Sequence, residues 1–292
     1  MNPAPTPMIL KGDIPTVTLE TKCWEGDYKR ILATSRLRTL AESNMYPFSE
    51  RWLMINNVKS YSRVCRLAEA AVRERWITRY VVVEEHAKEA LEFFGLDRAS
   101  LGAGYVYSIA ELVSLFLCGT DFLLHFAGDC HPHHPCDWIP EALAFLNSDA
   151  RVKVANLSWI CPFSPPYLEA TEVHEDFYVG YGFSDQCYMV RAADFRQAIY
   201  GEQNAASVRY PGYGGELFEK RVDSWMRNHA YLRATYRHGA YDHERGARTL
   251  KGTMRHYAGL MKRSMRRFSP GAMLPTQRTG TISAPKEMGG QP

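Results

Sequence analysis

Short apolar runs alternate with longer amphipathic stretches along most of the chain. The runs hold four to seven residues, are rich in β-branched and aromatic side chains, and are bounded by polar turns, which predicts strands. They lie at residues Thr16–Thr21, Trp52–Val58, Tyr80–Val83, Phe122–Phe126 and Val152–Leu157. The repeated strand-helix alternation predicts an α/β fold, with a mostly parallel, doubly wound central sheet between layers of helices.

The stretches between the strands carry apolar residues at helical spacing. Over residues 61–72 the apolar positions follow the i, i+3, i+4, i+7 order of a buried helix face. Further helices are expected at Glu84–Phe94 and, after a Gly-Gly turn, within Tyr210–Trp225. Asp27 stands just before another helical stretch, so we expect it to be the N-cap of that helix.

The strand Phe122–Phe126 ends abruptly at Ala127-Gly128-Asp129, within the stretch DFLLHFAGDCHPHHPCDW. In open α/β sheets, ligands bind at the carboxyl ends of the strands. A carboxylate there, followed by several histidines, is suited to hold a hard divalent cation and, through it, a phosphate. A plain turn residue is the alternative for Asp129. Its place at the end of a buried strand favours the ligand-binding interpretation.

The order of elements around this motif resembles the centre of GT-A glycosyltransferases of the family 2 type. The apolar strand, the Asp-containing motif, the helix WIPEALAFL and the strand VKVANLSW carry the resemblance. Those enzymes usually have Asp-x-Asp where this chain has Ala127-Gly128-Asp129, so the first Asp is missing. The resemblance implies a nucleotide-diphosphate sugar as donor and Mg²⁺ or Mn²⁺ as cofactor. It implies Asp129 as a metal ligand and His243, after the last predicted strand, as a second. A surface loop histidine is the alternative for His243.

The resemblance also implies where the nucleotide lies. In GT-A enzymes the loop after the first strand contacts the nucleoside, and TKCWEGDY has that place here. The second predicted strand closes with Asn56 and Asn57 at the same edge of the sheet. The implied donor-binding residues are Thr21, Cys23, Trp24, Glu25, Asn56, Asn57, Gly128 and Asp129.

Glu216, Glu219 and Asp223 follow the Gly-Gly turn at the start of a predicted helix. First-turn acids complement the helix dipole, which accounts for at least one of them. Inverting GT-A enzymes, however, carry their general base in an acidic motif at the start of such a helix. The resemblance therefore implies a base among these three residues and transfer to a hydroxyl of a glycan or lipid-linked saccharide. Inversion at the anomeric carbon is preferred because a candidate base exists, and retention is the alternative.

The sequence CHPHHPC, residues 130–136, also permits a zinc interpretation. Zinc sites in proteins combine Cys and His ligands at familiar spacings, and no second Cys or His pair stands at such a spacing in this chain. The prolines also stiffen the loop. Histidines that line the substrate loop are therefore the preferred interpretation.

Charge is unevenly distributed along the chain. The 292 residues have a net charge of +3, yet residues 245–286 contain ten Lys or Arg and no acid. Residues 249–268 predict a basic amphipathic helix that suits an anionic membrane surface, with a helix docked on the catalytic body as the alternative. The expected division is a flexible leader 1–15, a glycosyltransferase domain 16–245, a basic helix 246–270 and a disordered tail 271–292.

Other features favour a cytoplasmic location, at most peripheral to the inner face of a membrane. Seven cysteines without regular spacing predict reduced thiols. The N-terminus lacks the pattern of a secretion signal, and no apolar run approaches the roughly 18 residues of a membrane span. Nucleic acid is not an expected partner.

Two other classes of protein compete with the glycosyltransferase interpretation. A nucleotidyltransferase would share the α/β nucleotide site and the metal, but it would carry a Gly-rich basic signature after the first strand, where this chain has TKCWEGD. A non-catalytic nucleotide-sugar-binding protein with a decayed site is the second competitor, because the first Asp of the motif is missing.

Overall fold

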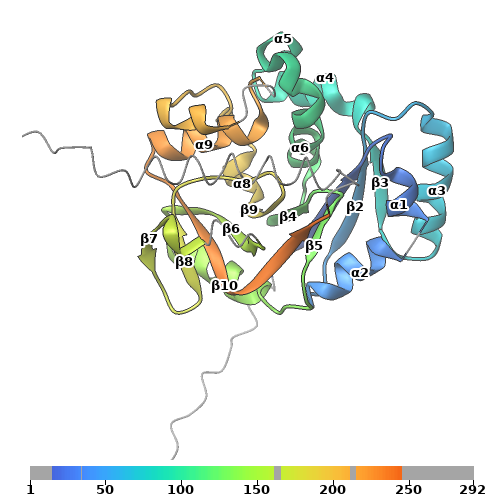
Figure 1. Ribbon diagram of the computed structural model, residues 1–292. Helices are drawn as coiled ribbons and strands as arrows, with labels where there is room; N and C mark the ends of the chain where they lie inside the picture. The colour runs from blue at the N-terminus through green and yellow to red at the C-terminus, as the bar shows by residue number, and fades with distance from the viewer. Residues whose placement is uncertain (1–14, 34, 161–165, 211–214, 245–292) are drawn as a thin grey trace, which may run out of the picture. The chain divides into compact units, whose positions relative to one another are not determined.

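The computed structural model describes residues 15–33, 35–160, 166–210 and 215–244, which form an α/β unit around one sheet (Figure 1). The strands are β1 (Val17–Cys23), β2 (Glu50–Ile55), β3 (Arg79–Val82), β4 (Phe122–Phe126), β5 (Cys130–Pro132), β6 (Val152–Trp159), β7 (Ala170–Val173), β8 (Phe177–Gly180), β9 (Cys187–Arg191) and β10 (Leu232–His243). The helices are α1 (Tyr28–Leu32), α2 (Arg36–Ser43), α3 (Tyr61–Arg73), α4 (Val83–Phe93), α5 (Arg98–Leu101), α6 (Tyr105–Leu117), α7 (Ile139–Ser148), α8 (Ala192–Phe195) and α9 (Phe218–Asn228). The short 3-10 turns are η1 (Gly102–Gly104), η2 (Pro166–Leu168) and η3 (Ala205–Arg209).

The sheet has the strand order β3-β2-β1-β4-β9-β6-β10-β8-β7, and β5 pairs with β10. Strands β3, β2, β1 and β4 are parallel, as in the first half of a doubly wound fold. Beyond β4 the pairing is mostly antiparallel, with β6 and β10 as a further parallel pair. The α/β class with helices around a central sheet is therefore confirmed, and the parallel arrangement is concentrated in its N-terminal half.

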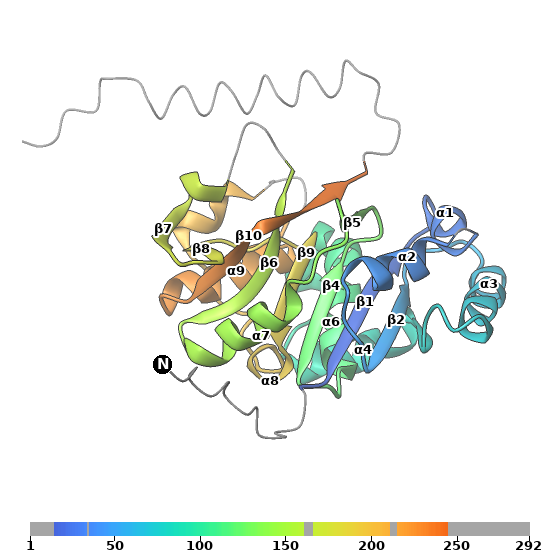
Figure 2. The ribbon, with the colours of Figure 1, turned by 90° about the horizontal axis from the view of Figure 1, so that it is seen from below.

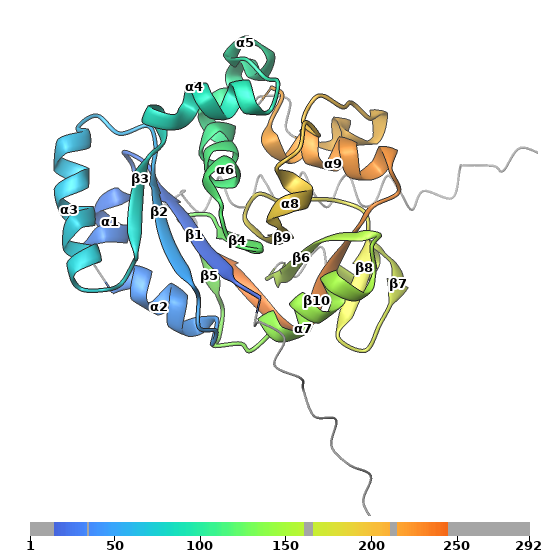
Figure 3. The ribbon, with the colours of Figure 1, turned by 180° about the vertical axis from the view of Figure 1, so that it is seen from behind.

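Helices cover both faces of this sheet (Figures 2 and 3). Helices α1, α2, α3 and α7 pack on one face, where their apolar residues join two adjacent core clusters. Helices α4, α6, α8 and α9 pack on the other face, in a third cluster. Because both faces are covered, the apolar residues of β4 are all buried, as their continuous run predicts.

Helix α6 is the main element that the sequence pattern did not predict. Together with α5 and η1 it forms the stretch Arg98–Leu117, which is long and apolar enough to cross a membrane by length and composition. However, 61% of its most apolar window is buried inside the protein, as in a core helix. The polar residues Ser108, Glu111 and Ser114 interrupt the apolar run, and all three are buried. Because these polar residues divide the apolar run, the sequence pattern did not show that Arg98–Leu117 is as long and apolar as a membrane span.

Two further elements differ from expectation. Asp27 occupies the N-cap position of α1, as predicted, but its side chain accepts a hydrogen bond from the backbone N–H of Trp24 (2.8 Å) and makes no capping hydrogen bond to the helix. Strand β10, of twelve residues, was not predicted, and it returns the chain to the middle of the sheet. The predicted basic helix 246–270, the tail 271–292 and nearly all of the leader lie outside the described residues.

Candidate active site

A cavity of about 1060 Å³ opens at the carboxyl ends of β1, β2 and β4. Its lining comes from the loops after these strands, the start of α6, the loop before β9, the start of α9 and the end of β10. Nine of the twelve residues proposed from the sequence line it: Cys23, Trp24, Glu25, Asn56, Asn57, Gly128, Asp129, Glu219 and His243. Thr21, Glu216 and Asp223 do not belong to the lining. The lining has five carboxylates and two lysines, so the cavity is acidic.

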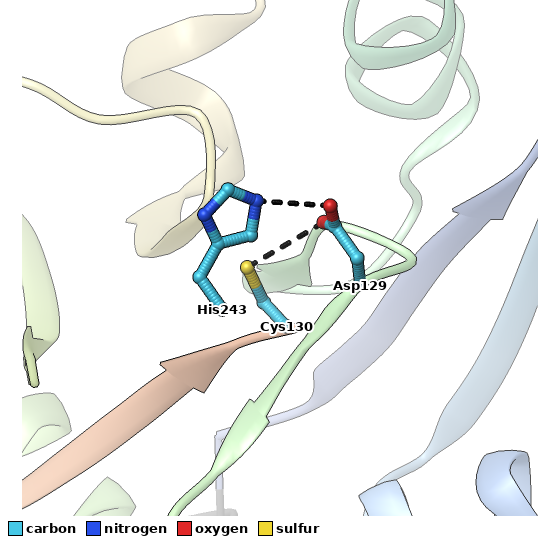
Figure 4. A group of neighbouring side chains, drawn as sticks. All are labelled: Asp129, Cys130 and His243. Atoms are coloured by element: carbon cyan, nitrogen blue, oxygen red, sulfur yellow. Dashed lines mark hydrogen bonds and ion pairs between the residues drawn. The ribbon is translucent and has the colours of Figure 1, made fainter. Parts of the chain in front are cut away.

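Asp129 and His243 both line this cavity, and their side chains point toward one another (Figure 4). His243 is the last residue of β10, and the pairing of β10 with β5 brings its Nε2 to 2.9 Å from Oδ2 of Asp129. Burial would raise the pKa of Asp129, but the hydrogen bond and the charge of His243 outweigh it and lower the pKa below its ordinary value. Asp129 is therefore ionised at neutral pH.

Cys130 is the third group near this pair. Its Sγ lies 3.8 Å from Oδ1 of Asp129, and the ligand atoms of Asp129, Cys130 and His243 all lie within 4.8 Å of one another. Burial, followed by the charge of Asp129, raises the pKa of the Cys130 thiol, so the thiol keeps its proton. The residues that fit a hard divalent cation are therefore Asp129 and His243.

Ion pairs and hydrogen bonds from residues outside the cavity lining hold the turn that carries Asp129 in place. Arg30 and Arg36 both form ion pairs with Glu244, and Nε of Arg36 also donates to the carbonyl oxygen of Gly128 (3.1 Å). The backbone N–H of Glu244 donates to the carbonyl oxygen of Asp129 (2.7 Å). A Cβ at Gly128 would collide with the carbonyl oxygen of Lys22. The turn therefore requires glycine at position 128, and its position relative to β10 is fixed.

The side of the cavity next to β2 has the groups proposed for the nucleoside. Glu25 accepts a hydrogen bond from the backbone N–H of Lys59 (2.8 Å). The Asn57 side chain donates to the carbonyl oxygen of Val106 (2.8 Å), and Asn57 has a positive φ of 52°. Trp24 is 56% exposed at this side, which is unusual for a tryptophan and leaves its ring accessible for stacking.

The three acids near α9 have different environments. Glu219, in the first turn of α9, lines the cavity. Glu216 lies before the helix and forms an ion pair with Lys220 (2.5 Å). Asp223 is fully buried, where it accepts hydrogen bonds from Ser207 (2.6 Å) and Arg227 (2.8 Å). Glu219 is therefore the acid of this group that can reach a ligand in the cavity.

The sequence analysis did not propose four charged residues of the lining: Lys22, Asp27, Lys59 and Asp185. Lys22 forms an ion pair with the buried Glu111 of α6. Burial alone would lower the pKa of Lys22, but Glu111, Asp185 and Glu20 outweigh it and raise the pKa, so the ammonium group stays charged. Charged residues within the apolar strand TVTLETKC were the available signal, because a buried charge requires a partner.

Asp27 has the opposite shift from Asp129. Burial, with a smaller contribution from the charge of Asp129, raises the pKa of Asp27 to about 6, although the Trp24 N–H and Arg30 counteract it. Two carboxylates in the lining of one cavity are thus held in different protonation states at mildly acidic pH. A divalent cation near Asp129 would favour the ionised form of both.

The histidine-rich loop lies beside the cavity and does not form a closed zinc cluster among the described residues. His133 contacts Asp242 (2.6 Å) and packs on the His134 ring. Nδ1 of His131 lies 3.6 Å from Glu244, and burial, followed by the charge of Arg36, lowers the pKa of His131. Within the described part of the chain, the group with metal-ligand geometry is the one around Asp129 instead.

No protein-family model matches this chain, and no curated protein matches it. Among solved structures, GalNAc-T7 with UDP, GalNAc and Mn²⁺ is similar over 79% of this chain and 44% of that chain, with 9% identity and a TM-score of 0.50. Glucosyl-3-phosphoglycerate synthase from Mycobacterium tuberculosis is similar over 87% of this chain and 80% of that chain, with 13% identity and a TM-score of 0.45. These structural neighbours are GT-A glycosyltransferases. At 9% identity, the similarity to GalNAc-T7 shows the fold alone, and this chain spans less than half of that protein.

Proposed function

We propose that this protein is a glycosyltransferase that moves a sugar from a nucleotide-diphosphate sugar to a hydroxyl acceptor. The observation that carries the proposal is the pairing of Asp129 with His243 in the lining of an acidic cavity, at the carboxyl ends of parallel strands. The GT-A-like fold supports it, and the UDP and Mn²⁺ of the GalNAc-T7 structure suggest UDP as the nucleotide and Mn²⁺ or Mg²⁺ as the cation.

Different residues of this chain would bind the cation and the nucleoside of the donor. Asp129 and His243 would hold the cation, and the bound cation would supply positive charge to the leaving diphosphate. Trp24, Glu25 and Asn57 would bind the nucleoside through a ring face, a carboxylate and an amide. An acidic cavity repels a free diphosphate, so donor binding should depend strongly on the cation.

Glu219 is the proposed catalytic carboxylate. In an inverting reaction it accepts the proton of the acceptor hydroxyl, which allows the oxygen to attack the anomeric carbon as the diphosphate leaves. The cavity position of Glu219 supports this role, and the burial of Asp223 argues against the same role for that residue. Proton NMR of the first product, which reads the anomeric configuration, distinguishes inversion from retention.

The experiment that tests the donor site is a thermal-shift screen with UDP, GDP, CDP and dTDP, each with EDTA, Mg²⁺ or Mn²⁺. We expect UDP to raise the melting temperature and the metal to increase the shift, since a ligand at about 100 times its Kd adds about 2.7 kcal/mol. Hydrolysis of a UDP-sugar in the same buffers then distinguishes a transferase from a binding protein. No shift with any nucleotide would rule out the donor site.

We also propose that the basic segment 249–268 localises the enzyme to the cytoplasmic face of a membrane. Its support is compositional, because residues 245–286 hold ten Lys or Arg and no acid, and each basic residue near an anionic bilayer adds about 1 kcal/mol. A truncation after Ala247 should lose sedimentation with anionic vesicles at low salt. Equal sedimentation of both proteins, or of neither, would contradict membrane attachment.

A further inference from the structure

Three charged side chains interact beside the cavity, and one of them belongs to α6. Lys22 and Asp185 belong to the lining, and Glu111 lies behind Lys22 as its ion-pair partner. Glu111 is fully buried, and among the described residues its Oε2 atom has no hydrogen-bond partner. A buried, half-satisfied carboxylate next to a cavity is costly unless a ligand or water completes its hydrogen bonds.

A second buried polar group lies directly behind this one. Glu20 of β1, His125 of β4 and Tyr188 of β9 stand in register across the sheet, on the face that α6 covers. All three are fully buried; His125 contacts Glu20 and stacks on the Tyr188 ring at 4.7 Å. Because this row and α6 are packed into the core, Glu111 cannot move away from Lys22. The Lys22 ammonium group is therefore presented to the cavity at a fixed position.

The charges around Lys22 determine whether it can bind the diphosphate or the sugar of a donor. Glu111 already balances the ammonium group, and Asp185 adds a further negative charge that acts on it. A negatively charged group bound beside Lys22 would be repelled by Asp185. Lys22 is therefore a poor partner for the diphosphate, whose charge a cation held by Asp129 and His243 would balance. Sugar hydroxyls suit Lys22 and Asp185, because each hydroxyl can accept from an ammonium group and donate to a carboxylate.

We propose that Lys22 and Asp185 form the subsite for the donor's sugar, with Glu111 as a positioning residue, and that this subsite selects a neutral, hydroxyl-rich sugar over a uronate. The inference rests on the proposed function and specifies its substrate class. A uronate would place its own carboxylate near Asp185. Lys22 would not compensate for this repulsion, because it already forms an ion pair with Glu111. A neutral hexose gains hydrogen bonds to charged groups without that repulsion.

The test compares the affinity for UDP with the affinity for UDP-hexose, measured by calorimetry on the full chain with Mn²⁺. Lys22→Met and Asp185→Asn should weaken UDP-hexose binding at least tenfold and leave UDP binding within about twofold, since UDP lacks the sugar. Lys153→Met is the matched control, because Lys153 is also largely buried and ion-paired, with Asp194 at 3.1 Å, but lies outside the cavity lining. It should leave the UDP-hexose to UDP affinity ratio unchanged.

Two further arms test position and selectivity. Glu111→Gln should also lower the UDP-hexose to UDP affinity ratio, a change that a purely structural loss would not produce. If that variant does not fold, Lys22→Met carries the test. Asp185→Asn should reduce discrimination between UDP-hexose and UDP-uronate by about tenfold, because the repelling charge is gone.

The outcomes separate this inference from the proposed function. If the wild-type protein binds UDP but Lys22→Met weakens UDP and UDP-hexose equally, Lys22 contacts the diphosphate and the sugar subsite is wrong. Unchanged ratios in both Lys22→Met and Asp185→Asn would overturn it as well. If the wild-type protein binds neither UDP nor any UDP-sugar, the donor-site proposal itself fails, and the subsite fails with it.

Discussion

The turn after β4 and the buried side of α9 each contain a candidate carboxylate, but the two environments differ. Asp129 lines a cavity, and its partner His243 comes from a strand more than 100 residues later. Asp223 is fully enclosed, and its partner Arg227 lies one helical turn away, with Ser207 as a second donor. Asp223 is paired inside the core and has no access to solvent. Asp129 retains an open side, which a carboxylate needs to bind a ligand.

The largest expected effect tests the structural side of this comparison. Asp223→Ala should lower the free energy of unfolding by about 3 kcal/mol, because it leaves the buried Ser207 hydroxyl and the partly buried Arg227 guanidinium without their carboxylate partner. Urea denaturation measures the change. The control is Glu172→Ala, which removes an exposed ion pair with Arg151 and should cost less than about 1 kcal/mol. Equal effects from the two variants would contradict a structural role for Asp223.

The next effect concerns catalysis by the other acid of α9. Glu219→Gln should lower kcat by about 100-fold or more, or about 2.7 kcal/mol in the activation barrier, with little change in donor affinity. Glu216→Gln is the matched control, since Glu216 pairs with Lys220 and does not line the cavity. Steady-state kinetics and UDP titration measure both quantities. A near-normal kcat for Glu219→Gln would leave the inverting mechanism without its base.

Asp129→Ala should remove the metal-dependent part of nucleotide binding. The increment in stability that Mn²⁺ adds to UDP binding should disappear; it can be at most about 2.7 kcal/mol when UDP with Mn²⁺ stands at 100 times its Kd. The fold should remain intact, because Asp129 is partly exposed and its loss leaves no core cavity. Asp242→Asn, one residue before His243 and paired with His133, serves as the control. If Asp129→Ala keeps the Mn²⁺ increment, Asp129 is a turn residue only.

The smallest expected effect comes from the opposite pKa shifts of Asp27 and Asp129, which both line the cavity. The pKa of Asp27 in the folded protein, about 6, lies above its ordinary value of 3.8. The protonated form therefore stabilises the fold below about pH 4, and this contribution is lost as pH rises through 6. Asp27→Asn should be more stable than wild type at pH 8, by about 1 kcal/mol after solvent screening.

The pH profile of this variant gives a clear criterion. In EDTA, the stability difference between Asp27→Asn and wild type should close as pH falls below about 4, because the wild-type carboxyl is then protonated as well. Asp129 should behave in the opposite way, since its lowered pKa favours the charged form and its contribution is lost as pH falls. A difference between Asp27→Asn and wild type that is independent of pH would mean that Asp27 is not perturbed by burial.

The sequence by itself determined the α/β class, several of the strands and the edge of the sheet where the cavity opens. The pattern of FLLHF, an apolar run that stops at a polar turn, predicts a buried strand with a functional end because burial and chain direction are local properties. Helix α6 escaped prediction because its buried polar residues, including Glu111, break the apolar pattern on which such predictions depend.

Only the tertiary structure decided which side chains meet. The pairing of β10 with β5 places His243 beside Asp129, and the packing of α6 on the sheet places Glu111 beside Lys22. Glu219 and Asp223 are both acids near the start of α9, one helical turn apart. Glu219 lines the cavity, whereas Asp223 is buried in the core. These contacts join residues far apart in the chain or depend on which side of a helix is buried. No local pattern specifies either, because both follow from the way whole elements pack together.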